Sequence, residues 1–83
     1  MDAAAIRDEV VAALRTRAPH VPGELGDDVG LDEKGLNLDS IAIVELLADC
    51  EERFHVELLS TLLDGRKLTI GRIVAAIRSG RGE

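Results

Sequence analysis

Asn37-Leu38-Asp39-Ser40-Ile41, followed by an amphipathic run to Phe54, is the stretch that decides the fold. Asp39 is a good N-cap residue, because its carboxylate can accept unpaired backbone N–H groups of a first helical turn. Leu38 and Ile43 stand at the N′ and N4 positions of a hydrophobic staple. Ser40 therefore falls at the first helical position, free of capping duty and over the positive end of the helix dipole. The pattern predicts an attachment point for a phosphodiester-linked group.

These residues resemble the attachment motif of the carrier-protein superfamily, the acyl and peptidyl carriers of fatty acid, polyketide and nonribosomal peptide synthesis. The family pattern is roughly Leu-Gly-x-Asp-Ser-Leu/Ile, followed by an acidic helix that ends in Glu-Glu-x-Phe. This chain has Leu36-Asn37-Leu38-Asp39-Ser40-Ile41, then Glu51-Glu52-Arg53-Phe54, and a closing Leu68-Thr69-Ile70-Gly71. Asn37 replaces the usual glycine, and asparagine is the next most tolerant residue for positive φ. The resemblance spans nearly the whole chain.

The resemblance implies that Ser40, with the helix cap Asp39 beside it, receives 4′-phosphopantetheine from coenzyme A. A Mg-dependent phosphopantetheinyl transferase would attach this arm, whose thiol would hold acyl or aminoacyl groups as thioesters. The pathway enzymes implied are adenylating ligases, acyltransferases, ketosynthases or thioesterases, and the protein itself would do no chemistry. The subtype stays open, because the acidic second helix looks like acyl carriers whereas Ser60-Thr61-Leu62-Leu63 looks more like peptidyl carriers. A free-standing carrier of a polyketide, nonribosomal or hybrid pathway fits this mixture, and the cargo leaves no trace in the sequence.

Helical periodicity in three places predicts an all-α bundle of three main helices plus one short helix, with a long first loop. Asp2 and Thr69 are the expected caps of the first and last helices, and Gly80 is placed to end the last one. The expected parts of this single domain (1–83) are a first helix at about 3–17, a loop at 18–38, a second helix at about 40–54, a short helix at about 58–64, a last helix at about 70–78 and a tail at 79–83.

The second helix has one apolar stripe for the core and another beside it. Ile43, Leu46, Leu47, Cys50 and Phe54 follow the i, i+3, i+4, i+7, i+11 spacing of a core-facing seam. Apolar residues next to carboxylates, beginning beside the serine, predict a docking surface for enzymes with basic, partly apolar clefts. The residues assigned to this docking surface are Ile41, Val44, Glu45, Ala48, Glu51, Glu52 and Glu57. The alternative is that Ile41 and Val44 pack against the long loop or the short helix.

Charge is distributed unevenly along the chain. Residues 24–64 contain twelve Asp or Glu against only Lys34 and Arg53, a balance of −10, whereas the remainder has a balance of +4. An acidic centre repels nucleic acid and anionic membranes and favours basic protein partners. The simpler explanation is a solvated acidic surface that keeps a small protein soluble. One cysteine excludes an internal disulfide, and neither a membrane span nor a signal peptide is evident, so a cytoplasmic monomer is expected.

Other site types have weak support. His20 and His55 lack zinc-ligand spacing, so no metal site is expected. The aspartates from Asp28 onward do not follow the residue pattern of an EF-hand calcium-binding loop. Cys50 lies on the core stripe and is interpreted as a small core hydrophobe rather than a nucleophile. A serine hydrolase using Ser40 is rejected because no base, orienting acid or oxyanion pocket is evident in so small a domain. An unmodified acidic helical adaptor remains the alternative to a carrier.

Overall fold

The computed structural model describes residues 2–18, 21, 26–32 and 35–82. Over these ranges the chain forms four α-helices, which are α1 (Ala3–Arg15), α2 (Ser40–Phe54), α3 (Leu59–Leu62) and α4 (Ile70–Gly80). The only strand-like pairing in the same ranges is one isolated bridge between Gly30 and Thr69. The predicted all-α bundle of three main helices and one short helix is confirmed.

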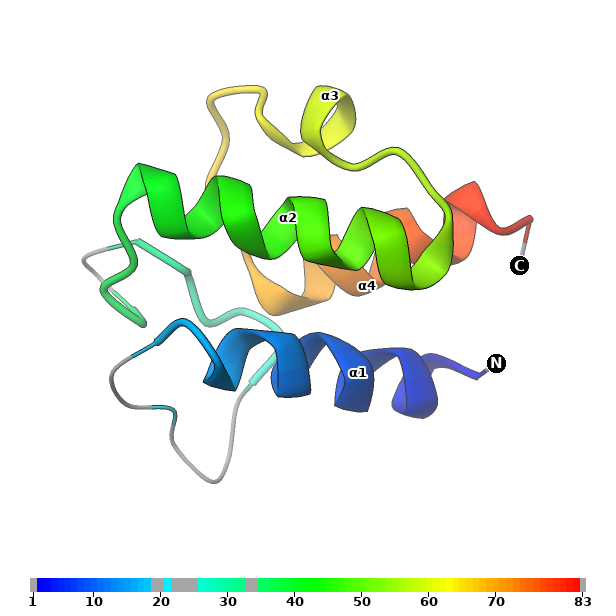
Figure 1. Cartoon of the computed structure of the whole chain (residues 1–83), viewed down its shortest axis with the longest axis horizontal. Helices are drawn as coiled ribbons and strands as arrows, with labels where there is room; N and C mark the ends of the chain where they lie inside the picture. The colour runs from blue at the N-terminus through cyan, green and yellow to red at the C-terminus, as the bar shows by residue number, and fades with distance from the viewer. Residues whose placement is uncertain (1, 19–20, 22–25, 33–34, 83) are drawn as a thin grey trace.

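The three long helices lie side by side (Figure 1). α1 and α2 run in opposite directions, and α4 lies behind them. α1 packs against α4 and α2, and the short α3 packs against α4 and α2. The two ends of the chain lie at one end of the bundle, and the start of α2 lies at the other (Figure 1). Ser40 is therefore far from both termini.

The core is built from one apolar face of each helix, as the helical spacing predicts. The second-helix seam is buried except for Ile43, which is half-buried and packs at the edge of the core. The long first loop also contributes three buried leucines, so it packs on the bundle as expected. The buried side chains are Ile6, Val10, Ala13, Leu14, Leu31, Leu36, Leu38, Leu46, Leu47, Cys50, Phe54, Leu58, Leu62, Ile70, Ile73 and Ile77.

Loop residues complete the hydrogen bonding at the start of α4. The Gly71 N–H donates to the Asp27 carbonyl at 2.9 Å, and the Ile70 N–H donates to the Val29 carbonyl at 3.4 Å. The loop carbonyls thus satisfy backbone donors that a helix leaves unpaired at its N-terminus. Leu25, another apolar residue of this loop, lies outside the described residues.

The helix caps expected at the starts of α1 and α4 are confirmed. The Asp2 carboxylate accepts the Ala5 N–H at 2.8 Å, and the Thr69 hydroxyl accepts the Arg72 N–H at 3.1 Å. Each cap therefore fixes the first residue of its helix.

Three helix ends differ from the expected bounds, for local reasons. α1 ends at Arg15 instead of residue 17. The Thr16 hydroxyl donates a hydrogen bond to the Ala13 carbonyl at 2.7 Å, and the last turn of the helix is tightened there. α3 covers only Leu59–Leu62, not 58–64, since Leu63 has a non-helical backbone.

The end of α4 also differs from the expected residue 78, because Gly80 is itself the last residue of the helix and Arg81 follows as its C-cap. A Cβ at this position would come within 2.9 Å of the Val56 side chain, so the glycine permits a close approach between α4 and the segment after α2. The residue with positive φ is Gly82, at 78°. The helix therefore extends two residues beyond the expected end at 78.

Candidate functional site

Ser40 is the first residue of α2, and its side chain is exposed. The Asp39 carboxylate caps the helix by accepting the Ala42 N–H at 2.8 Å, and the Asp39 carbonyl accepts the Ile43 N–H at 3.0 Å. Within the described part of the chain, the Ser40 hydroxyl makes no hydrogen bond. The hydroxyl is thus open to solvent and to an incoming reagent.

The backbone before the serine is shaped by a turn in positive φ. Asn37 has φ of 59°, as expected from its place in the motif, where the carrier-protein pattern that the chain resembles has glycine. Its N–H donates to the Asp32 carbonyl at 2.8 Å, and the neighbouring Leu38 N–H donates to the Leu31 carbonyl at 2.9 Å. With Leu38 buried and Ile43 half-buried, both ends of the expected hydrophobic staple lie on the core. This turn and staple set the direction in which α2 leaves the loop.

The surface next to Ser40 is apolar and shallow. Ser40, Ile41, Val44 and Glu45 line a depression of about 250 Å³. The Ile41 side chain is 71% exposed and that of Val44 is 40% exposed. The Ile41 side chain is therefore mostly open to solvent, whereas Val44 is partly covered. Ala48, the third member of the predicted stripe, is half-buried.

A larger groove begins one helical turn further along α2. It has a volume of about 520 Å³ and is lined by Asp32, Ile43, Leu62, Leu63 and residues 65–68. Ile43 is three residues after the serine, so it lies on the same side of the helix. The groove was not predicted from the sequence, because α3 and the segment after it form its far wall.

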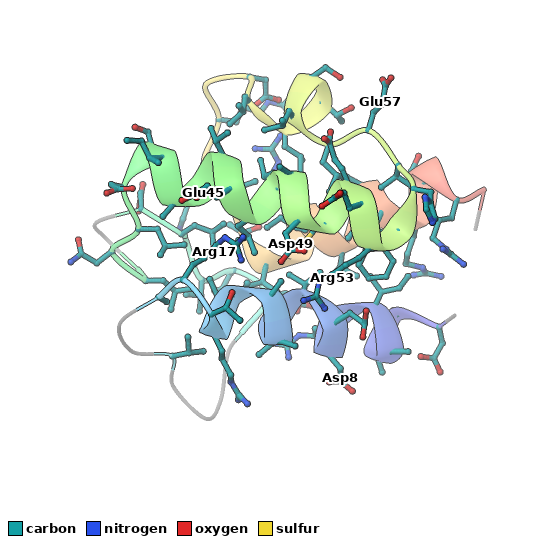
Figure 2. All side chains as sticks on the ribbon, viewed as in Figure 1. Asp8, Arg17, Glu45, Asp49, Arg53 and Glu57 are labelled. Atoms are coloured by element: carbon teal, nitrogen blue, oxygen red, sulfur yellow. The ribbon has the colours of Figure 1, made fainter. Side chains whose placement is uncertain are left out.

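The acidic residues of α2 have different surroundings (Figure 2). Asp49 is ion-paired with Arg17 at 3.2 Å, which joins α2 to the segment after α1, and with Arg53 of the same helix at 3.1 Å. Glu45 and Glu52 are exposed and form no salt bridge with any other described residue. The negative charge available to a partner therefore lies at Glu45 and Glu52, and Glu57, also exposed, follows the helix.

Glu51 was assigned to the docking surface from the sequence, but in the structure it also forms hydrogen bonds within the chain. Its carboxylate accepts the Leu58 N–H at 2.6 Å and the Leu59 N–H at 3.0 Å. These two bonds, opposed by partial burial, hold the pKa of Glu51 below its ordinary value. The carboxylate is thus engaged within the chain at the start of α3.

The other titratable candidates show no reactive arrangement. Cys50 is buried, and this burial raises the pKa of its thiol to about 11, so the thiolate is scarce at neutral pH. Over the described ranges, no group of three or more His, Cys, Asp or Glu side chains is placed to hold a metal ion. His20 lies outside the described residues. In the same ranges, no helix has the length and apolar character needed to cross a membrane.

Comparison with known protein families gives one match. The family model described as the phosphopantetheine attachment site matches residues 6–77, from within α1 to within α4. The chain belongs to this family. Comparisons with curated proteins and with solved structures found no significant match.

Members of the phosphopantetheine attachment family bind 4′-phosphopantetheine covalently, so this chain is a phosphopantetheine-carrying carrier protein. Such carrier domains are generally non-catalytic, are modified by phosphopantetheinyl transferases and interact with biosynthetic enzymes.

The start of α2 fits a covalently attached phosphate ester. The reacting group must be an accessible hydroxyl, and Ser40 offers one without a competing hydrogen bond to another described residue. The backbone N–H groups of Ser40 and Ile41 belong to the first helical turn, which leaves them without partners inside the helix. They lie at the positive end of the α2 dipole, where a phosphodiester anion is stabilised.

Proposed function

We propose that Ser40 is the residue to which 4′-phosphopantetheine is attached. The observation that supports this most directly is the exposed, unbonded hydroxyl at the first position of α2, capped by Asp39 rather than by the serine itself. The family match includes this residue, since it extends over 6–77. Ser40 stands in the Asp-Ser-Ile sequence that resembles the carrier attachment motif.

The chain's own residues would orient the modified serine. Asp39 fixes the first turn of α2, and the N–H groups of Ser40 and Ile41 would be available to stabilise a phosphodiester attached there. The attached arm supplies a terminal thiol that holds acyl or aminoacyl groups as thioesters. The protein is thus a non-catalytic carrier for polyketide, nonribosomal peptide or related biosynthesis.

The surface around Ser40 supports docking by several enzymes in turn. Ile41 and Val44 offer exposed apolar contact, with the half-buried Ala48 behind them, and Glu45, Glu52 and Glu57 offer negative charge. A phosphopantetheinyl transferase and pathway enzymes such as an adenylating ligase, acyltransferase, ketosynthase or thioesterase would use this surface. The proposal includes a monomeric carrier in the cytoplasm, where a reducing environment keeps thiols free.

The attachment site is tested by modification and intact mass. Wild-type protein incubated with coenzyme A, Mg²⁺ and a promiscuous transferase should gain the mass of one arm, and Ser40→Ala should gain none. The variant should fold normally, because Asp39 supplies the cap and alanine is a good helix former. Ser60→Ala, which removes an exposed serine of α3, is the matched control and should be modified like wild type. Modification of Ser40→Ala would overturn the assignment of the site.

Thiol counting gives an independent readout of the same experiment. Before modification the folded protein should react very slowly with a thiol reagent, because Cys50 is buried and is the only cysteine. After modification one fast-reacting thiol should appear. A fast thiol in the unmodified protein would show that Cys50 is accessible and would remove the value of this assay.

A further inference from the structure

The single turn of α3 is stabilised by residues that lie outside this helix. α3 has four residues, and no side chain within it or at its own N-cap position, Leu58, caps its start. An isolated turn of this length is unstable in water, because the conformational entropy lost in forming the first turn exceeds the stabilisation from its hydrogen bond. α3 therefore depends on the groups that contact it.

Glu51 supplies the missing cap from the last turns of α2. Its carboxylate oxygen Oε2 accepts the N–H groups of both Leu58 and Leu59, at 2.6 and 3.0 Å. Hydrogen bonds to an ionised acceptor are shorter and stronger than neutral ones. The buried side chains of Leu58 and Leu62 hold the inner face of α3, so Glu51 is its polar attachment to α2.

α3 and the chain after it form one wall of the groove that begins at Ile43, one helical turn after Ser40. Leu62 and Leu63 line this groove from α3 and its end, and Ile43 lines it from α2. Leu63 is also 52% exposed, so it belongs to the outer surface as well as to the groove. The width of the groove and the place of Leu63 relative to α2 both follow from the position of α3.

We propose that Glu51 is a positioning residue that latches α3 to α2 and so sets the shape of the groove next to Ser40. It acts through α3 and does not touch the attached group. This inference rests on the proposed function only for its consequence, which is that partner enzymes meet a groove of fixed shape beside the modified serine. The latch itself exists in the unmodified protein.

Amide hydrogen exchange on the unmodified protein tests the latch. Glu51→Ala removes the oxygen that accepts both hydrogen bonds, and exchange at Leu58, Leu59 and Leu62 should rise about tenfold or more, with α1 and α4 unchanged. Glu51→Gln keeps one oxygen acceptor, so its exchange rates should fall between those of Glu51→Ala and wild type. Glu52→Ala removes an exposed neighbouring acid and is the matched control, for which α3 exchange should not change.

Loading kinetics separate a latch from a docking charge. A docking charge is screened by salt, so the defect of Glu52→Ala should shrink as ionic strength rises. The defect of Glu51→Ala should persist at high salt, because it comes from a displaced groove wall. Unchanged α3 exchange in Glu51→Ala, an equal rise over all helices, or a salt-sensitive defect that matches Glu52→Ala would each overturn the proposal. If instead Ser40→Ala were still modified, only the attachment site would be wrong, since the exchange result needs no arm.

Discussion

At the scale of single residues, the carboxylates of α2 show that one functional group serves four purposes. Asp39 caps the helix, Asp49 pairs with two arginines, Glu51 caps α3, and Glu45 remains exposed without a salt bridge in the described part of the chain. Only an unengaged carboxylate can interact with a partner without weakening the fold. Charge counts along the chain therefore overstate the acidic surface that a partner enzyme meets.

Asp39 combines a structural role with a charge next to Ser40, and two substitutions separate them. Asp39→Ala removes the cap and should cost about 0.5–2 kcal/mol of unfolding free energy. For a domain of this size, each 1 kcal/mol lowers the melting temperature by about 4–8 °C. Asp39→Asn retains a good cap and should melt close to wild type. Thermal melts and loading rates of both variants are the measurements.

The loading rates decide what the Asp39 charge does. If the charge helps the transferase, Asp39→Asn should load more slowly despite its unchanged stability. Equal loading of wild type and Asp39→Asn would show that Asp39 is structural only.

At the scale of elements, the starts of the three long helices and the end of α2 could be predicted from the sequence, whereas the ends of α1, α3 and α4 could not. The caps Asp2, Asp39 and Thr69 lie within three residues of the N–H groups they accept, so a local pattern reveals them. The role of Glu51 depends on a contact seven residues away, which requires His55 to turn the chain at φ of 56°. No residue spacing in the sequence indicates that turn, because it requires a histidine in the left-handed backbone conformation, which residues other than glycine rarely adopt. For the same reason the groove walled by α3 was missed.

The pH dependence of α3 follows from the lowered pKa of Glu51. The N–H groups of Leu58 and Leu59 favour the ionised carboxylate, so its stabilising effect is fully present above the ordinary pKa of 4.5. It is lost as pH falls through the lowered folded-state value. Protection of α3 amides should therefore weaken as the pH falls below the ordinary pKa of about 4.5.

The matched control for this pH effect is Glu51→Gln, which cannot titrate at this position. Asp64 also has a lowered pKa, first because the Arg66 N–H binds its carboxylate, and it titrates in both proteins. The difference between the two pH profiles is thus due to Glu51. Profiles of equal steepness would show that the carboxylate of Glu51 does not hold α3.

At the scale of the whole molecule, the fold converts an acidic sequence segment into a smaller acidic surface beside Ser40. Arginines from outside that segment return to neutralise part of it, as when Arg17 of the segment after α1 pairs with Asp49 and Arg7 pairs with Asp27. Such pairings join residues far apart in the sequence, so the balance along the chain could not show them. The acidic side chains that remain exposed on α2 are those of Glu45 and Glu52, and α2 is the helix that begins with Ser40.

The last prediction tests whether this surface guides partner enzymes. Glu45→Lys should leave the fold intact, because Glu45 is exposed and lies off the buried seam, yet it should slow loading at low salt. Added salt should shrink the deficit, since exposed charges act mainly on the association rate and are screened. Asp8→Lys makes the same change in net charge on α1, where Asp8 projects away from α2 (Figure 2). Association kinetics with a transferase at several ionic strengths measure both variants. An equal slowing by Asp8→Lys would mean that bulk charge, and not a localised docking surface, sets the rate.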